Sequence, residues 1–133
     1  MRRLLVSLLC LPCLFHVLAA AQGKVAKGAP CGESMTQSEA NACSRREYEE
    51  ADAEMIKVYD QLMSELGGGS GKDQQKLKQA QMLWLQYRDA NCESEASIYE
   101  GGTIRPAIYN HCLTSMTRER AARIKAFLAE LKM

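Results

Sequence analysis

Residues 80–92 have the sequence AQMLWLQYRDANC, which contains Trp84, the only tryptophan of the chain. In a helix, residues three and four positions apart lie on one face, so Trp84 and Arg88 would share a face with Gln81 and Asn91. A tryptophan on such a face is large enough to fill the centre of a small helical bundle. This segment therefore predicts a packed seam between helices rather than a catalytic site.

Arg88 is the residue of this seam that most needs a partner. Its guanidinium is never neutral, so burial beside Trp84 requires a hydrogen-bond acceptor. Asp52, or a backbone carbonyl of the Gly-Gly-Thr turn at 101–103, would provide one. Cys92, four residues after Arg88, would then fasten the end of the seam to a neighbouring segment.

Apolar residues at three- and four-residue steps predict three helices, over 37–66, over 72–97 and from Pro106 to about Leu131. No segment shows the alternating, β-branched pattern that is typical of strands. The expected buried positions of the first helix are Tyr48, Ala51, Met55, Val58 or Tyr59, Leu62 and Leu66. Those of the second helix are Leu77, Ala80, Gln81, Trp84, Tyr87 or Arg88, and Asn91. Those of the third helix are Ile108, Cys112, Met116, Ile124, Phe127 and Leu131.

Capping and turn residues mark the helix ends. Thr36 and Glu39 can form a capping box, in which each side chain binds the backbone amide of the other residue. The glycine-rich run at 67–71 ends the first helix, and Ser70 is expected to cap the second. Pro106 suits the first turn of the third helix. Three helices with short connections predict an all-α fold, a small antiparallel up-down-up bundle.

The N-terminus has the three parts of a secretory signal peptide. Arg2 and Arg3 are followed by an apolar run and then by three alanines that end at Ala21, which predicts cleavage at this point. A lipoprotein signal is the alternative, but Cys13 lies inside the apolar run and follows a proline. The run is also too short for a comfortable membrane span. The expected parts of the chain are a signal peptide at 1–21, a flexible lead-in at 22–35 and one helical domain at 36–133.

Removal of residues 1–21 leaves four cysteines, Cys31, Cys43, Cys92 and Cys112. An even number in an exported chain of this size indicates two disulfides. A zinc site built from the same residues is a weaker alternative, because no CxxC pair is present and export leads to an oxidising compartment. The helix lengths gather the four at one end of the bundle. Two pairings satisfy this geometry, Cys31–Cys43 with Cys92–Cys112 or Cys43–Cys92 with Cys31–Cys112, and the first is slightly preferred because it closes short local loops.

The net charge and the residue types argue against several classes of function. The formal net charge is +1, and it becomes −1 when Arg2 and Arg3 leave with the signal peptide, so nucleic-acid binding is not expected. Beyond the signal peptide the only histidine is His111, and no sequence motif of a serine hydrolase, a zinc protease or a phosphate-binding loop occurs. We therefore expect neither an enzyme nor a metal or cofactor site.

Acidic residues dominate 33–65, and basic residues dominate 103–133. Attraction between helices would explain this asymmetry and would help to select the topology. Alternatively, the acidic surface steers a basic protein partner toward the chain. On charge alone the first explanation is favoured.

Several motifs follow one another in a distinctive order: a cysteine, TQ-x-E-x-N-x-C, an acidic helix with a tyrosine, AQ-x-x-W-x-x-YRD-x-x-C, a GGT turn, and a late cysteine before T-x-x-R. Besides the cysteines, the residues concerned are Thr36, Gln37, Glu39, Asn41, Tyr48, Asp52, Gln81, Trp84, Tyr87, Arg88, Asp89, Gly101, Gly102, Thr103 and Arg120. This order resembles the LprI-like N-terminal domain family, which is named for a mycobacterial lysozyme inhibitor. The resemblance covers about 31–128 and implies a small, exported, disulfide-bonded helical domain of bacteria and, less directly, lysozyme inhibition.

Two functions are expected on these grounds. In the first, the periplasmic or secreted chain binds and inhibits a basic, lysozyme-type peptidoglycan hydrolase through the acidic face of the first helix. A loop would enter the cleft of the hydrolase, either the glycine loop at 67–71 or the Glu-Gly-Gly-Thr loop at 100–103. The candidate contact residues are Glu47, Glu49, Glu50, Glu54, Gly67, Gly68 and Gly69. In the second, the chain is a structural or assembly module of the bacterial envelope that binds another protein and inhibits nothing.

Overall fold

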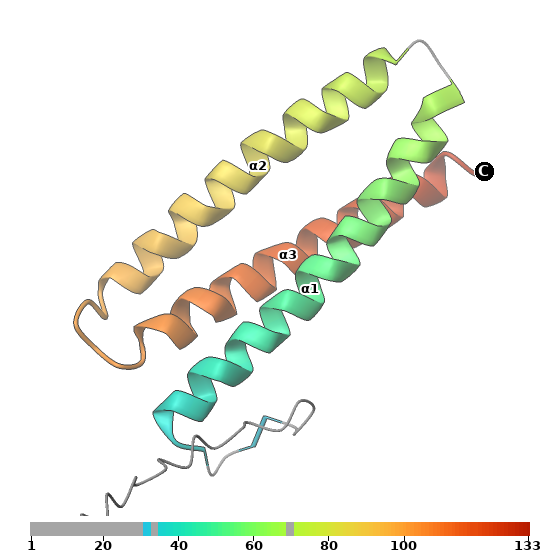
Figure 1. The fold of residues 1–133 in the computed structure, drawn as a ribbon. Helices are drawn as coiled ribbons and strands as arrows, with labels where there is room; N and C mark the ends of the chain where they lie inside the picture. The colour runs from blue at the N-terminus through green and yellow to red at the C-terminus, as the bar shows by residue number, and fades with distance from the viewer. Residues whose placement is uncertain (1–30, 33–34, 69–70) are drawn as a thin grey trace, which may run out of the picture.

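The computed structural model describes residues 31–32, 35–68 and 71–133, which form three long antiparallel helices (Figure 1). Their order along the chain is α1 (Gln37–Glu65), a short 3₁₀ turn η1 (Leu66–Gly68), α2 (Lys72–Ser97) and α3 (Arg105–Glu130). The described residues contain no strand. The predicted all-α bundle of three helices is therefore confirmed.

The predicted signal peptide at 1–21 and most of the predicted lead-in at 22–35 lie outside the described residues. Cys31, the first residue described, is held to α1 by a disulfide. Among the helices of the described part, none combines the length and the apolar composition needed to cross a membrane.

The first turn of α1 holds the predicted capping box. The backbone amide of Thr36 donates to the Glu39 carboxylate at 2.8 Å, and the backbone amide of Glu39 donates to the Thr36 hydroxyl at 3.3 Å. These bonds satisfy amides that have no partner inside the helix. The hydrogen bonds from Thr36 also lower the pKa of the Glu39 carboxyl.

The other two helices begin near glycine and proline. Gly71 precedes α2 with a φ of 73°, a left-handed conformation that glycine adopts at little cost. No side chain caps this N-terminus, and Ser70, the predicted cap, lies outside the described residues. Pro106 stands in the first turn of α3, as predicted. In the loop before it, Gly101 turns the chain with a φ of 77°.

The core forms chiefly between α1 and α3, which pack along each other, whereas α2 packs mainly against α3. The larger apolar cluster lies in the half of the bundle that contains the end of α1. Its buried members are Met55, Val58, Leu62, Ala121, Ile124 and Leu128, and the half-buried Tyr59, Leu66, Leu77 and Trp84 pack against them. The three buried members from α1 are all predicted core positions.

A second, smaller cluster contains Cys92, Cys112 and Leu113 and lies near the loop between α2 and α3. The Cys92–Cys112 disulfide joins α2 to α3, with 5.4 Å between the two Cα atoms. The Cys31–Cys43 disulfide joins the segment before α1 to α1 itself, with 5.9 Å between the Cα atoms. This is the preferred one of the two predicted pairings.

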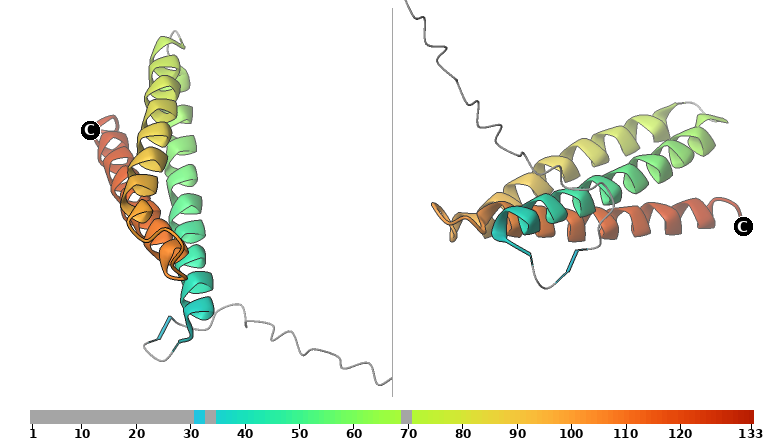
Figure 2. Two further views of the ribbon diagram at one scale, coloured as in Figure 1. Left: turned by 90° about the vertical axis from the view of Figure 1, so that its left-hand side faces the viewer. Right: turned by 60° about the horizontal axis from the view of Figure 1, so that its bottom comes forward.

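Several positions that periodicity assigns to the core are instead exposed, and this part of the prediction is wrong. They are Ala80, Phe127 and Leu131. Of the predicted alternatives Tyr87 and Arg88, Arg88 is buried and Tyr87 is exposed. The physical reason is the course of α2, which meets α3 at the loop that joins them and diverges from it towards the C-terminal end of α3 (Figures 1 and 2). The side of α3 that faces α2 is therefore only partly covered. Leu128, which packs with the α1 cluster, is buried in place of Leu131.

Candidate functional site

The Arg88 side chain lies at the centre of the seam between the helices, and Arg88 is only 5% exposed. Its guanidinium forms an ion pair with Asp89 at 2.8 Å and a longer one with Asp52 of α1 at 3.6 Å. It also donates to the hydroxyl of Thr117 on α3 at 3.3 Å. Asp52, one of the two acceptors expected from the sequence, therefore faces Arg88, and the buried charge is paired.

Two aromatic rings and a second arginine surround this ion pair. The Arg88 guanidinium lies 5.2 Å from the centroid of the Trp84 ring and 5.5 Å from that of Tyr48. The Arg120 guanidinium lies 5.7 Å from the Trp84 centroid. Burial raises the pKa of the Tyr48 hydroxyl, and the positive charge of Arg88 opposes this shift. We refer to these residues together as the Arg88 cluster, which comprises Tyr48, Asp52, Trp84, Arg88, Asp89, Thr117 and Arg120.

Gln81 connects the Arg88 cluster to the apolar core. Its side-chain amide donates to the sulfur of Met55 at 3.1 Å, and its carbonyl oxygen accepts from Nε of Arg120 at 3.0 Å. Gln81 is only 7% exposed, and these two bonds satisfy the NH₂ group and the carbonyl oxygen of its buried amide. Because these side chains bind one another across three helices, the Trp-x-x-Tyr-Arg-Asp motif acts mainly as a structural tie.

The motif residues at the start of α1 fasten this helix to the loop between α2 and α3. Gln37 donates to the side chain of Asn41 at 2.9 Å, and Asn41 donates to the backbone carbonyl of Thr103 at 2.9 Å. The turn at 101–103, the other acceptor expected for Arg88, thus accepts a hydrogen bond from Asn41 instead. The guanidinium of Arg88 pairs with the carboxylates of Asp52 and Asp89. A Cβ at Gly102 would approach a backbone carbonyl oxygen to 3.1 Å, so the close turn favours glycine there.

Part of the acidic side of α1 is neutralised by α3. Glu54 pairs with Lys125 at 2.7 Å, and Glu65 pairs with Lys132 at 3.1 Å. The hydrogen bond from Lys125, followed by its charge, lowers the pKa of the Glu54 carboxyl. Attraction between helices therefore accounts for part of the charge asymmetry. Lys125 is absent from the predicted site, and the basic character of 103–133 was the only sequence signal for it.

Glu49 and Glu50 remain as exposed acids, and neither has an ion-pair partner within the described part of the chain. Glu47 lies 3.8 Å from Nδ1 of His111. A shallow cavity of about 390 Å³ opens between α1 and α3 beside these acids. It is lined by Glu50, Ala51, Glu54, Arg118, Ala121, Ala122 and Lys125. The cavity thus brings Glu50 and Glu54 together, beside cations of α3.

The glycine loop does not join this acidic surface. Gly67 and Gly68 lie in η1 at the end of α1, and Gly69 lies outside the described residues. At 1.5 Å per residue, Glu50 and Gly67 are separated by roughly 25 Å along the helix axis. The side chain of Gln74 donates to a backbone carbonyl near the end of α1 at 2.8 Å and braces the loop. The candidate partner surface therefore consists of two separate surfaces.

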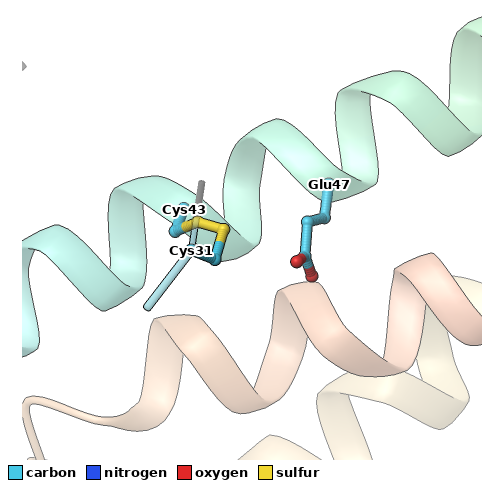
Figure 3. A group of neighbouring side chains, drawn as sticks. All are labelled: Cys31, Cys43 and Glu47. Atoms are coloured by element: carbon cyan, nitrogen blue, oxygen red, sulfur yellow. A yellow bond between two sulfur atoms is a disulfide. The ribbon is translucent and has the colours of Figure 1, made fainter. Parts of the chain in front are cut away.

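Cys31, Cys43 and Glu47 are close enough to be considered as metal ligands, because their ligand atoms lie within 4.8 Å of one another (Figure 3). The two sulfur atoms are bonded to each other, so they offer no thiolate to a metal ion. The Cys92–Cys112 disulfide occupies the other two cysteines in the same way. The oxidised chain therefore lacks the donor set on which the zinc alternative depends.

Comparison with known proteins shows similarities over most of the chain. The family model described as lysozyme inhibitor LprI matches residues 29–124. An uncharacterised protein of Rhizobium meliloti (strain 1021) is 30% identical over 108 residues, which cover 74% of this chain and 78% of that protein. The crystal structure of a DUF1311 family protein from Pseudomonas putida KT2440 has the same fold, with a TM-score of 0.66 at 23% identity. That similarity covers 71% of this chain and 96% of the solved one.

Proposed function

The chain belongs to the LprI family, and from this premise we propose that it is an exported helical binding protein that inhibits a lysozyme-type peptidoglycan hydrolase. The family match over residues 29–124 is the observation that carries the proposal. The two disulfides support export, because disulfides persist in oxidising compartments outside the cytosol. The mature protein would be periplasmic or secreted. Its proposed parts are a signal peptide at 1–21, a lead-in at 22–35 and the LprI domain at 36–133.

Glu49 and Glu50 are the residues to which we assign contact with the hydrolase. Exposed carboxylates that form no ion pair with the described residues attract a basic protein over distances comparable to the Debye length. Glu50 also lines the cavity between α1 and α3, which has room for a basic side chain of the partner. Glu54 is paired with Lys125 and Glu47 lies beside His111, so both contribute less. The glycine loop at 67–69 would touch only a partner that extends along α1.

The test is lysis of a peptidoglycan suspension by a basic lysozyme, with the disulfide-intact protein titrated in at low and at moderate salt. We expect dose-dependent inhibition that weakens as salt increases. The double change Glu49→Lys with Glu50→Lys should remove most of the inhibition. Glu119→Lys with Glu130→Lys, the same change of charge at two exposed positions of α3, should leave it largely intact. A folded sample that inhibits none of several lysozymes would refute the proposal.

A second function, as an envelope interaction module without inhibitory activity, is favoured by one observation on α2. Residues 79–87 carry no charge, and Met82 and Leu83 are 56% and 54% exposed. An uncharged, apolar helix face of this kind is typical of protein contact surfaces. If this role is correct, Leu83→Asp should dissociate a complex with another envelope protein, and Ile56→Asp on α1 should not. Lysis by lysozyme should be unaffected by the protein.

Both functions are binding functions, as expected for a family of inhibitors rather than enzymes. We propose no catalytic residue, metal or cofactor. The His111 side chain is the nearest to a catalytic candidate, but it is 61% exposed, and within the described part of the chain the acidic group beside it is Glu47, at 3.8 Å. An activity that disappears in the variant His111→Ala would contradict a purely binding role.

A further inference from the structure

Two adjoining cavities lie between α2 and α3, and together we call them the α2–α3 groove. The first has a volume of about 300 Å³ and is lined by Trp84, Tyr87, Met116, Glu119, Arg120 and Arg123. The second has a volume of about 450 Å³ and an apolar lining of Leu66, Leu77, Ala80, Phe127 and Leu131. Arg120 lines both cavities, so they are neighbours. Each volume falls within the usual range for small-molecule sites.

The groove explains why several apolar positions are exposed. Ala80, Phe127 and Leu131, which periodicity assigns to the core, all line it, and so does Tyr87, the predicted alternative to the buried Arg88. Tyr87, Phe127 and Leu131 are 61%, 43% and 46% exposed. Apolar side chains at core spacing that no helix covers offer their surface to another molecule.

The two walls of the groove run along the helices. On α2 the wall consists of residues at three- and four-residue steps, Leu77, Ala80, Trp84 and Tyr87. On α3 it consists of Arg120, Arg123 and Phe127 at the same steps, and it ends at Leu131, directly after the helix. Because α2 and α3 are antiparallel, the start of α2 lies at the same end of the bundle as the end of α3. Trp84 and Tyr87 of α2 line one cavity together with Arg120 and Arg123 of α3. The wall on α2 is roughly 15 Å long. The groove is therefore apolar at one end and cationic at the other.

Arg120 and Arg123 give the cationic end of the groove its positive charge. Nε of Arg120 donates to the neutral Gln81, and neither Arg120 nor Arg123 forms an ion pair with any described residue. Burial lowers the pKa of the Arg120 guanidinium, and the nearby charge of Arg123 adds to this effect. Glu119 lines the same cavity but lies beyond ion-pair distance of both arginines. At the apolar end, Asp73 and Lys76 pair with each other at 3.1 Å and so leave no excess charge.

We propose that the α2–α3 groove binds a single-chain carboxylate amphiphile, such as a fatty acid of medium length. The carboxylate would lie at Arg120 and Arg123, where it supplies the missing negative charge, because arginine forms strong, directed hydrogen bonds to carboxylates. The alkyl chain would extend past Ala80 and Leu77 towards Phe127 and Leu131, whose exposed apolar surface it would cover. Charge complementarity and the order of the two cavities select this ligand class. The site uses none of the acidic residues assigned to the hydrolase and goes beyond the proposed inhibition.

The test uses the intrinsic fluorescence of Trp84, which lines the groove and is the only tryptophan in the chain. Dodecanoate, kept below its critical micelle concentration, is titrated into the disulfide-intact protein. We expect a saturable change with one ligand bound per chain. Dodecanol has the same alkyl chain and no charge. It should bind at least about tenfold more weakly than dodecanoate, because it forms no charged hydrogen bond with the arginines.

Variants at exposed positions separate the two ends of the groove. Arg123→Gln should weaken dodecanoate about tenfold and should remove most of the preference over dodecanol. Arg118→Gln, on the same helix but outside the groove, is the matched control and should bind normally. Leu131→Ala should weaken both ligands about threefold to fivefold through lost apolar contact. Ile56→Ala, at a similarly exposed position of α1, should have no effect.

Three outcomes would overturn the proposal. The first is equal binding of dodecanoate and dodecanol, because the arginines would then play no part. The second is unchanged affinity in both Arg123→Gln and Leu131→Ala, because the ligand would then lie elsewhere. The third is a response to vesicles of anionic phospholipid, or concentration-dependent self-association measured by light scattering, without any response to monomeric dodecanoate. In that case a membrane surface or a second copy of the chain would occupy the groove.

Discussion

Replacing Arg88 by methionine should destabilise the protein less than removing the two carboxylates that pair with it. The side chains of Asp52 and Asp89 are 32% and 52% exposed, so water can solvate them when the guanidinium is absent. Arg88 is 5% exposed, and without the carboxylates its charge would keep only the Thr117 hydroxyl and the neighbouring rings. A buried charge without a counter-charge is the more costly of the two defects.

The magnitudes follow from these contacts. Arg88→Met loses charged hydrogen bonds and two cation–π contacts worth about 1 kcal/mol each. Methionine replaces part of the packing against the aromatic rings, and the freed carboxylates regain water, so we expect a net loss of about 1–2 kcal/mol. Asp52→Ala combined with Asp89→Ala should cost about 3 kcal/mol or more. The triple variant, which combines Arg88→Met with Asp52→Ala and Asp89→Ala, should be more stable than this double variant, because it no longer contains the unpaired guanidinium.

Urea unfolding, followed by far-ultraviolet circular dichroism with disulfides intact, measures all four proteins. With a denaturant slope of about 1–2 kcal/mol per molar urea, the double variant should unfold at a midpoint roughly 2 M lower than the parent. The Arg88→Met midpoint should fall by about half as much. If the double variant is as stable as Arg88→Met, or the triple variant is the least stable of all, the guanidinium does not depend on its carboxylates and the reasoning fails.

Three further perturbations test the core, the cross-link and an ion pair. Leu62→Ala removes a side chain that is fully buried and should lower the free energy of unfolding by about 2–5 kcal/mol, measured by urea titration. Replacement of Cys92 and Cys112 by serine should lower the free energy of unfolding by about 3 kcal/mol, provided that the parent and the variant are both folded at the start of the titration. Because the pKa of Glu54 is lowered in the folded state, its pair with Lys125 stabilises the protein above the unfolded pKa, and this contribution is lost as pH falls through the folded pKa. Acidification should therefore destabilise the parent more than Glu54→Gln, and an equal loss in both would contradict the assignment.

The three helices are predictable because their signals are local. The Thr36 capping box, the glycine run after Leu66 and Pro106 act within a few residues of each helix end, and each is found where the sequence places it or within one residue. Helix length gathers the four cysteines at one end of the bundle but leaves two pairings open, and the observed pairing is the one preferred because it closes short local loops. The Asn41 bond to Thr103 could not be foreseen, because it joins residues that are 62 positions apart and depends on how the loop lies against α1.

The candidate site was less predictable, because the charge of a surface depends on pairing across helices. The acids of α1 form one run in the sequence, but Asp52 turns to Arg88 and Glu54 turns to Lys125. Composition reveals an excess of acid and cannot say which carboxylates a neighbouring helix neutralises. The exposed Glu49 and Glu50 are the acids to which we assign most of the role that the charge pattern suggests, and this role remains a proposal.

The errors of the periodicity argument share one physical cause, which is the tilt of α2. Helical spacing tells which side chains lie on one face, but not whether another helix covers that face along its whole length. α2 is fastened to α3 by the Cys92–Cys112 disulfide at one end and to α1 and α3 by the Arg88 cluster near its middle, and the apolar residues beyond these ties are left beside the diverging end of α3. The apolar surface left uncovered there costs stability in water. A ligand that covers this surface would offset that cost, and this is the function beyond stability that we propose for the α2–α3 groove.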